Sequence, residues 1–216
     1  MGQKVHPKAF RLNTVKQWDS KWFRRKDFAA TLEEDTRIRA FLLRVLREAS
    51  LDRVEIERSG NHLTVTVRSA KPGFIIGRAG TGAEELKQKI LRQFYPGKKT
   101  QMHLNIVEVP RGSLSAAVVA EQAAMDIEKR LPYRRVMKQI IDRVGKSGAK
   151  GVKVKLSGRL GGAEISRREQ LASGSIPLHN LRADIDYAQA TAHTIYGTIG
   201  VKIWINRGEV FEKENK

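Results

Sequence analysis

The feature that most constrains the fold is a glycine loop, Gly77-Arg78-Ala79-Gly80, which joins an apolar run to a helical pattern. Leu86, Ile90 and Leu91 follow it at helical spacing. Because glycine lacks a Cβ, the backbone at Gly77 and Gly80 can adopt positive φ and approach another chain closely. A helix that begins after such a turn offers free N–H groups and the positive end of its dipole. The loop therefore suits a sugar-phosphate backbone, and a tight turn without a ligand is the alternative.

The segments around the loop predict a small sheet. Two alternating stretches, 54–57 and 63–67, predict strands joined through Ser59-Gly60-Asn61, and a third strand is expected from Met102 to Val109. Strand, strand, glycine loop, helix, strand resembles the type II KH fold, an RNA-binding module whose loop clamps about four nucleotides of backbone. This resemblance implies an RNA-binding loop at Gly77, Arg78 and Gly80. Many relatives carry two basic residues between the glycines, and Ala79 in one of these places implies a weaker grip on phosphate.

The charge of the chain indicates a polyanionic partner. Its 216 residues include 41 Lys and Arg against 23 Asp and Glu, which gives a formal net charge of +18. Such a charge repels itself in a compact state and is tolerated best when a polyanion neutralises it. Nucleic acid is favoured over an anionic membrane, and over a merely soluble basic protein, because the cations lie in predicted folded segments as well as in a tail.

Several function classes find no support in the sequence. There is no cysteine, hence no disulfide and no Cys-type zinc site, which fits a reducing compartment, the cytoplasm or an organelle matrix. No segment approaches the roughly 20 apolar residues that cross a bilayer, and no secretory signal is recognised. The glycine loop lacks the Gly-Lys-Ser/Thr ending of a nucleotide-binding loop. We therefore expect no enzyme, no cofactor, no metal, no small-molecule substrate and no membrane; the histidines are scattered without ligand spacing (His6, His62, His103, His179, His193).

The first segment, residues 1–26, is predicted to be a basic N-terminal arm. Large apolar residues interleave with its cations, which suggests an arm that becomes ordered against RNA or a partner protein. The alternative is that Trp18, Trp22 and Phe23 form a small amphipathic helix on the next domain. The candidate RNA contacts in the arm are Lys4, Lys8, Arg11, Arg24, Arg25 and Lys26.

Three further helices are expected, over 28–50, 114–130 and from Tyr133 onward, and Ser113 is the expected N-cap of the helix over 114–130. On a helical wheel the third helix gathers its apolar residues on one side, Val136, Met137, Ile140 and Val144. Arg134, Arg135 and Lys138 fall on the opposite side. A face of one sign costs repulsion at helical spacing, so an anionic partner explains it better than solvent alone.

The C-terminal part predicts a second sheet. Val152, Val154 and Leu156 alternate with Lys153 and Lys155, which are expected to face outward. Further strands are expected near 164–169, 181–187 and 199–205, and Asp184 and Asp186 are expected to pair with Arg182 on one strand face. The predicted fold class is α+β with two domains, a type II KH domain and a domain of two helices on a four-stranded, mostly antiparallel sheet. The expected boundaries are 1–26 for the arm, 27–109 for the KH domain, 110–207 for the C-terminal domain and 208–216 for a short tail.

Four long motifs carry a more specific resemblance: residues 1–7, 157–169, 177–187 and 196–205. Together they resemble the bacterial-type family of small-subunit ribosomal protein number three, which contains a KH domain. The resemblance covers nearly the whole chain, and Lys8-Ala9 departs from the Asn-Gly that is frequent in relatives.

The family resemblance implies a cytoplasmic protein of the small-subunit head that binds ribosomal RNA and neighbouring ribosomal proteins. It also implies that Arg134, Arg135 and Lys138 line the channel where messenger RNA enters and help to unpair structured messages. Further candidate contacts with ribosomal RNA are Lys153, Lys155, Arg159, Arg167 and Arg168. A free KH-type RNA-binding regulator is the alternative, and it would stay at the top of a sucrose gradient, whereas a ribosomal component would sediment with the small subunit.

Overall fold

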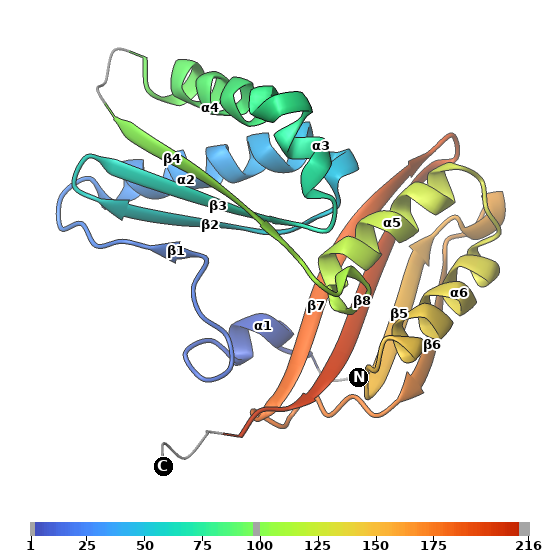
Figure 1. The fold of residues 1–216 in the computed structure, drawn as a ribbon. Coiled ribbons are helices and arrows are strands. Elements are labelled where there is room, and N and C mark those ends of the chain that lie inside the picture. Colours follow the sequence, from blue (N-terminus) through green and yellow to red (C-terminus); the bar gives the residue numbers. More distant parts are fainter. Residues whose placement is uncertain (1–2, 97–99, 212–216) are drawn as a thin grey trace. The chain divides into compact units, whose positions relative to one another are not determined.

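The structure, a computed structural model, describes residues 3–96 and 100–211 and divides into two compact units (Figure 1). We name the two units by their place in the sequence. The inner unit is Trp18–Pro110, in the middle of the chain, and the outer unit combines Met1–Gln17 with Arg111–Lys216. The predicted arm, residues 1–26, is thus shared between the two units. Of the predicted tail, 208–216, the last strand includes the first two residues, and residues 212–216 lie outside the described part, as do Met1 and Gly2 of the first family motif.

The inner unit is built on a four-stranded sheet in the order β1-β2-β3-β4. β2 and β3 form an antiparallel hairpin whose turn contains Gly60 at φ 57°, while β3 pairs with β4, and β1 with β2, in parallel. Val54 lies opposite Val67 and Ile56 opposite Val65, and all four are buried, as alternation predicts for strands with one covered face. The elements are β1 (Ser20–Lys21), α2 (Phe28–Val45), η1 (Arg47–Ala49), β2 (Leu51–Ser59), β3 (His62–Ser69), α3 (Pro72–Ile76), η2 (Arg78–Gly80), α4 (Thr81–Phe94) and β4 (Gln101–Glu108).

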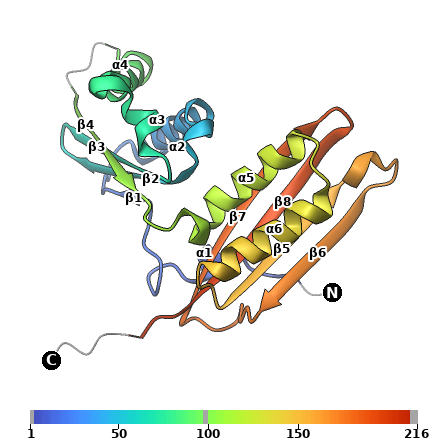
Figure 2. The same cartoon turned by 45° about the vertical axis from the view of Figure 1, so that its right-hand side comes forward.

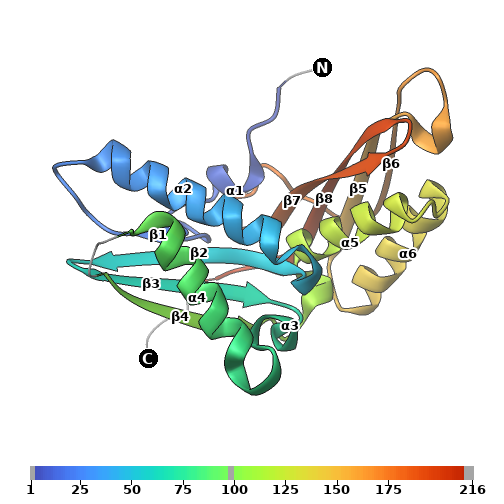
Figure 3. The ribbon, with the colours of Figure 1, turned by 90° about the horizontal axis from the view of Figure 1, so that it is seen from above.

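Helices α2 and α4 lie on the same face of this sheet (Figure 3). Ile38 and Leu42 of α2, and Leu86 and Ile90 of α4, are buried in one cluster with the sheet residues. The order helix, strand, strand, two helices, strand confirms the predicted KH architecture.

The predicted alternative of an amphipathic helix around Trp18 and Trp22 is wrong. The segment is extended, and its two-residue strand β1 pairs with β2. Buried Asp35 fixes it there, because the carboxylate accepts hydrogen bonds from Ser20 Oγ at 2.9 Å and from Trp22 Nε1 at 2.7 Å. Trp22 is therefore held by a polar contact, whereas Trp18 remains exposed.

The outer unit is built on an antiparallel sheet in the order β6-β5-β8-β7, with α5 and α6 on one face (Figure 2). Val154 lies opposite Ile203 and Leu156 opposite Val201 on the face that the helices cover. The elements are α1 (Pro7–Phe10), η3 (Gly112–Leu114), α5 (Ala116–Glu128), α6 (Tyr133–Lys146), β5 (Gly151–Gly158), η4 (Leu160–Gly162), β6 (Arg167–Gly174), β7 (Ala183–Thr194) and β8 (Gly197–Glu209).

Two boundaries in this unit differ from the prediction. Ser115, and not Ser113, caps α5, because residues 112–114 form a 3-10 turn and the Ser115 side chain accepts a hydrogen bond from Val118 N at 3.3 Å. The strand expected near 164–169 begins at Arg167 and continues to Gly174, because the chain bends at Glu164 and Ile165 after the η4 turn.

The described start of the chain packs against the sheet of the outer unit. α1 packs on β7, and Arg11, which is fully buried, donates five hydrogen bonds to backbone carbonyls. Four of the acceptors lie about 170 residues later in the sequence, at Pro177, Leu178, Asn180 and Ala183; the fifth is Pro7.

Candidate nucleic-acid interface

The glycine loop of the inner unit has the backbone geometry expected from its sequence. Gly77 has φ 68° and ψ −171°, and Gly80 has φ 81° in the left-handed region, where it serves as the N-cap residue of α4. Thr81 Oγ1 donates a hydrogen bond to the Arg78 carbonyl at 2.9 Å, which closes the turn. The Arg78 side chain is exposed beside the start of a 14-residue helix. The loop can therefore present N–H groups and one guanidinium to a phosphate.

Two features of this loop were missed at the sequence level. A Cβ at Gly82 would lie 2.8 Å from the Ile75 carbonyl oxygen, so only glycine lets α3 and α4 approach this closely. Phe74 is 67% exposed next to the loop, with Lys71 Nζ 5.8 Å from the centre of its ring. Such a ring offers a surface on which a base can stack. The Gly-Phe-Ile-Ile-Gly run could have indicated that Phe74 is exposed, because an apolar run that ends at an exposed loop is not expected to be buried throughout.

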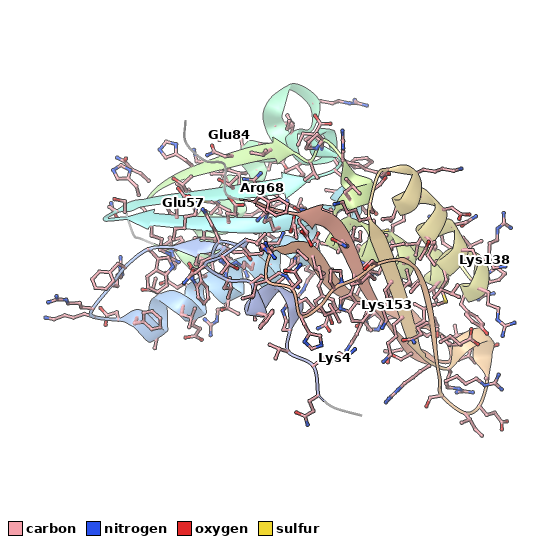
Figure 4. All side chains as sticks on the ribbon, turned by 90° about the horizontal axis from the view of Figure 1, so that it is seen from below. Lys4, Glu57, Arg68, Glu84, Lys138 and Lys153 are labelled. Carbon is pink, nitrogen blue, oxygen red and sulfur yellow. The ribbon has the colours of Figure 1, made fainter. Side chains whose placement is uncertain are left out.

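The face of α6 in the outer unit carries the predicted cationic triple. Val136, Met137, Ile140 and Val144 are buried against the sheet, as the wheel predicted. Arg134, Arg135 and Lys138 are all exposed on the other side, and Figure 4 shows the Lys138 side chain projecting outward from α6. In the two described ranges, Arg135 and Lys138 form no ion pair with a carboxylate.

Arg134 differs from its two neighbours because a carboxylate orients it. Its Nη2 lies 3.4 Å from Glu169 Oε1, which also accepts a 2.8 Å hydrogen bond from the Tyr133 hydroxyl. That hydroxyl, helped by the Arg134 charge, lowers the pKa of Glu169, while the bond to Glu169 raises the pKa of Arg134. The pair stays ionised at neutral pH, and the guanidinium is held 5.7 Å from the Tyr133 ring centre. Glu169 and Tyr133 were not predicted, because they act through a contact between β6 and α6.

A second cationic region lies on the face of the outer sheet opposite α5 and α6. Lys153 Nζ is 5.5 Å from the ring centre of Trp204, and the pKa of Lys153 is lowered by partial burial and by the charges of Lys4 and Lys155. Lys4 and Lys153 are both labelled in Figure 4. Lys155 lies opposite Lys202 in the register. The sequence could have predicted that Lys202 and Trp204 lie on this face, since they alternate with the buried residues of β8.

The remaining predicted contacts are placed differently. Arg167 and Arg168 on β6 are exposed, as are Arg24, Arg25 and Lys26 of the inner unit. The Arg159 guanidinium already makes two hydrogen bonds within the chain: Nε donates to the Ala163 carbonyl at 2.8 Å, and Nη1 donates to the Tyr196 carbonyl at 3.2 Å. Lys8 is half-buried and pairs with Asp186 at 3.1 Å.

The prediction that Arg11 contacts RNA does not fit the structure. Its guanidinium is inaccessible and already bonded to carbonyls, so it holds the N-terminal segment against β7.

The predicted pairing of Arg182 with Asp184 and Asp186 is also wrong. An irregularity between Ala183 and Ile185 changes the register there. The partners of Asp184 are Lys16, at 2.6 Å, and Arg207, at 3.9 Å, and the partners of Asp186 are Lys8 and Arg207. Burial acts to raise the pKa of Asp186, but the Lys8 and Arg207 charges and the Ala116 N–H lower it.

Within the part of the chain that the structure describes, no three His, Cys, Asp or Glu side chains are grouped so that they could hold a metal ion. None of the described helices combines the length and the apolar character that a bilayer crossing needs.

Comparisons with known proteins agree with this architecture. The family model for the KH domain matches residues 37–114, and that for the C-terminal domain of ribosomal protein S3 matches residues 123–205. Small ribosomal subunit protein uS3 of Bacillus cytotoxicus is 49% identical over 216 residues, which is 100% of this chain and 97% of that protein. The proteins of the same name from Syntrophomonas wolfei (48%, over 97% of this chain and 91% of theirs) and Staphylococcus aureus (47%, over 100% and 97%) are similarly close.

Proposed function

The chain belongs to the small ribosomal subunit protein uS3 family, and from this premise we propose that it helps to guide messenger RNA into the subunit. The family is one of structural ribosomal proteins rather than enzymes, and a member works with the ribosome in the cytoplasm. Its KH domain implies binding of ribosomal RNA. The finer proposal is that Arg134, Arg135 and Lys138 line the channel where messenger RNA enters and disfavour re-pairing of the message.

One observation carries this proposal: the cationic triple stands exposed on a helix whose opposite face is locked into the core. A long basic side chain on a loose segment could fold back onto a carboxylate. Here the buried side of α6 fixes the direction of all three, and two of them have no carboxylate to neutralise them among the described residues. The uncompensated charge is available to a strand of phosphates.

The mechanism that follows is electrostatic. Cations on α6 replace the counterions of a single strand, so affinity falls steeply with salt. Arg134 and Arg135 can bind a phosphate with two N–H groups and stack on a base, which Lys138 cannot. A strand held in this way is less free to pair again. The chain itself has no nucleotide-binding loop, so movement of the ribosome would supply the energy for unpairing.

We further propose that the other exposed cations hold the protein on ribosomal RNA and beside neighbouring proteins of the subunit head. In the inner unit these are Arg24, Arg25, Lys26 and Arg78, and the backbone at Gly77 and Gly80 of the loop contributes with Arg78. In the outer unit they are Lys4, Arg167 and Arg168, and the partly buried Lys153, Lys155, Lys8 and Arg159 contribute through their accessible atoms. Arg11 is not among them.

The experiment is purified translation of a message that carries one stable hairpin, using subunits reconstituted with Arg134→Ala, Arg135→Ala and Lys138→Ala together. These side chains are exposed, so assembly should be intact, and passage through the hairpin should slow while an unstructured message is read at the normal rate. The matched control removes three exposed charges from the same unit (Arg143→Ala, Lys146→Ala and Lys150→Ala) and should leave hairpin passage unchanged. Equal hairpin transit in wild type and the first variant would count against the proposal.

A further inference from the structure

A cavity of about 460 Å³ opens next to the cationic triple, and no part of the proposed function uses it. All its walls belong to the outer unit: the end of α5 and the connection to α6, the η4 turn, and the tip of the β7–β8 hairpin. Its volume lies within the range of roughly 300–1,000 Å³ that is typical of small-ligand pockets. Tyr133, Arg159, Gly161, Gly162 and Tyr196 are the lining residues on which the argument rests.

The two glycines of η4 separate two tyrosine rings. Gly161 has φ 68°, and a Cβ there would lie 3.8 Å from Tyr133 Cε1. Gly162 has φ 82°, and a Cβ there would lie 3.1 Å from Tyr196 Cε2. A side chain at either position would need a strained backbone, and at Gly162 it would also press on the ring. The Leu-Gly-Gly turn, which lies within the family motif of residues 157–169, thus leaves open space between two aromatic walls.

Each ring carries a guanidinium. Arg134 lies 5.7 Å from the ring centre of Tyr133, and Arg159 lies 5.7 Å from that of Tyr196. Hydrogen bonds hold this arrangement before any ligand arrives, since Tyr133 donates to Glu169 and Arg159 donates to the Ala163 and Tyr196 carbonyls. Tyr196 is still 53% exposed, so part of its ring is accessible.

We propose that this cavity receives one unpaired nucleobase of the RNA strand that lies along α6. The inference rests on the proposed function, because it needs a strand at Arg134, Arg135 and Lys138. Stacking on aromatic rings is how single-stranded RNA is held without base pairing, and an arginine beside the ring adds an attraction for the base or its phosphate. Arg134 belongs to the cationic face and lies 5.7 Å from the ring centre of Tyr133, which lines the cavity, so a strand on that face presents its next base there. A base held in this way is withdrawn from pairing.

The test measures the affinity of the full chain for two ligands: a single-stranded RNA pentanucleotide, and the same sugar-phosphate backbone without bases. Tyr196→Leu keeps the backbone carbonyl that holds Arg159 and removes the ring. It should lower affinity for the intact RNA by roughly 5- to 100-fold, the value of one stacked base, and leave affinity for the abasic backbone unchanged. Tyr196→Phe should bind both like wild type.

The matched control is Phe211→Leu. Phe211 is 65% exposed and has Arg182 5.9 Å from its ring centre, so it is an arginine–aromatic pair in the same unit that does not line the cavity. It should leave both affinities unchanged. A second measurement does not depend on any variant: RNA with one 4-thiouridine, crosslinked to the wild-type chain in isolated small subunits, should label the peptide that contains Tyr196 or Tyr133.

Three results would overturn the inference: no loss in Tyr196→Leu, an equal loss for intact and abasic RNA, or 4-thiouridine crosslinks that label neither the Tyr196 nor the Tyr133 peptide. Failure of the proposed function gives a different pattern. If the Arg134, Arg135 and Lys138 triple variant bound both RNAs as wild type does, the cationic face itself would not bind RNA. If that variant lost affinity for both RNAs while Tyr196→Leu lost none, only the cavity inference would fail.

Discussion

Replacing Arg11 tests whether a basic residue of this chain works inside the fold rather than on RNA. Its five hydrogen bonds join the N-terminal segment to residues 177–183, and the side chain is 0% exposed. Arg11→Met keeps most of the apolar stem and removes every donor. The carbonyls of Pro177 and Asn180 each keep a bond from a backbone N–H, so three bonds are lost in full. At about 1–1.5 kcal/mol for each, the free energy of unfolding of the outer unit should fall by ~3–5 kcal/mol.

The assay is thermal unfolding combined with hydrogen exchange read by mass spectrometry. For a unit of this size the loss corresponds to a fall in Tm of roughly 10–20 °C. Peptides from residues 3–17 and 177–183 should lose protection, while β2 and β3 of the inner unit should keep theirs. Arg11→Lys should recover only part of the stability, because an ammonium cannot reach carbonyls in several directions as the planar guanidinium does.

The matched control is Arg168→Met, an exposed arginine on β6 of the same unit. It should change stability by less than about 0.5 kcal/mol and weaken salt-dependent RNA binding instead. The reasoning is refuted if Arg11→Met unfolds at the wild-type temperature, retains protection in both segments and loses RNA affinity as Arg168→Met does.

Two further predictions concern the glycine loop and the acid stability of the outer unit. Gly82→Ala places a Cβ 2.8 Å from the Ile75 carbonyl oxygen, so it should force α3 and α4 apart and lower the free energy of unfolding of the inner unit by about 1–3 kcal/mol. It should also weaken RNA binding more than the control Gly73→Ala, whose Cβ meets nothing within 4 Å. Equal behaviour of the two variants would contradict this prediction. Because the folded-state pKa of Asp186 is lowered from its ordinary 3.8, the unfolded state takes up that proton first, and stability present above pH 3.8 should be lost as the pH falls through the folded pKa. Denaturant unfolding between pH 2 and 5 should show this slope in wild type and a shallower one in Asp186→Asn.

The elements with strong periodicity could be predicted from the sequence. Alternation in β5 and β8 placed Val154, Leu156, Val201 and Ile203 correctly, since the covered face of a sheet demands apolar side chains at every second residue. The wheel of α6 separated its buried and exposed faces for the same reason. In β6 the prediction failed at the boundary: this edge strand is exposed on nearly every residue, and no buried face imposed a pattern.

The candidate site could be predicted only where neighbours in the sequence form it. The glycine loop and the cationic face of α6 each lie within a few residues, so a pattern could reveal them. The burial of Arg11 depends on carbonyls about 170 residues away, and nothing in the local sequence separates Arg11 from an exposed arginine. The cavity between Tyr133 and Tyr196 needs three distant segments, of which the sequence showed only the Leu-Gly-Gly turn.

The cations of this chain therefore divide by what surrounds them, and the division explains how a protein of such high charge can be stably folded. Arg11 and Arg58 are enclosed, the first by carbonyls and the second by Glu34 and Asp35, and Arg207 pairs with Asp184 and Asp186. The charges of these side chains are compensated by partners within the same unit. Arg135 and Lys138 have no such partner in the described ranges, so their repulsion is relieved only when an anion binds. Arg134 lies between the two groups, because Glu169 orients it without enclosing it. That position places one side chain on the exposed face of α6 and beside Tyr133, which lines the cavity, and this is the arrangement expected where a strand of phosphates and a single base are held together.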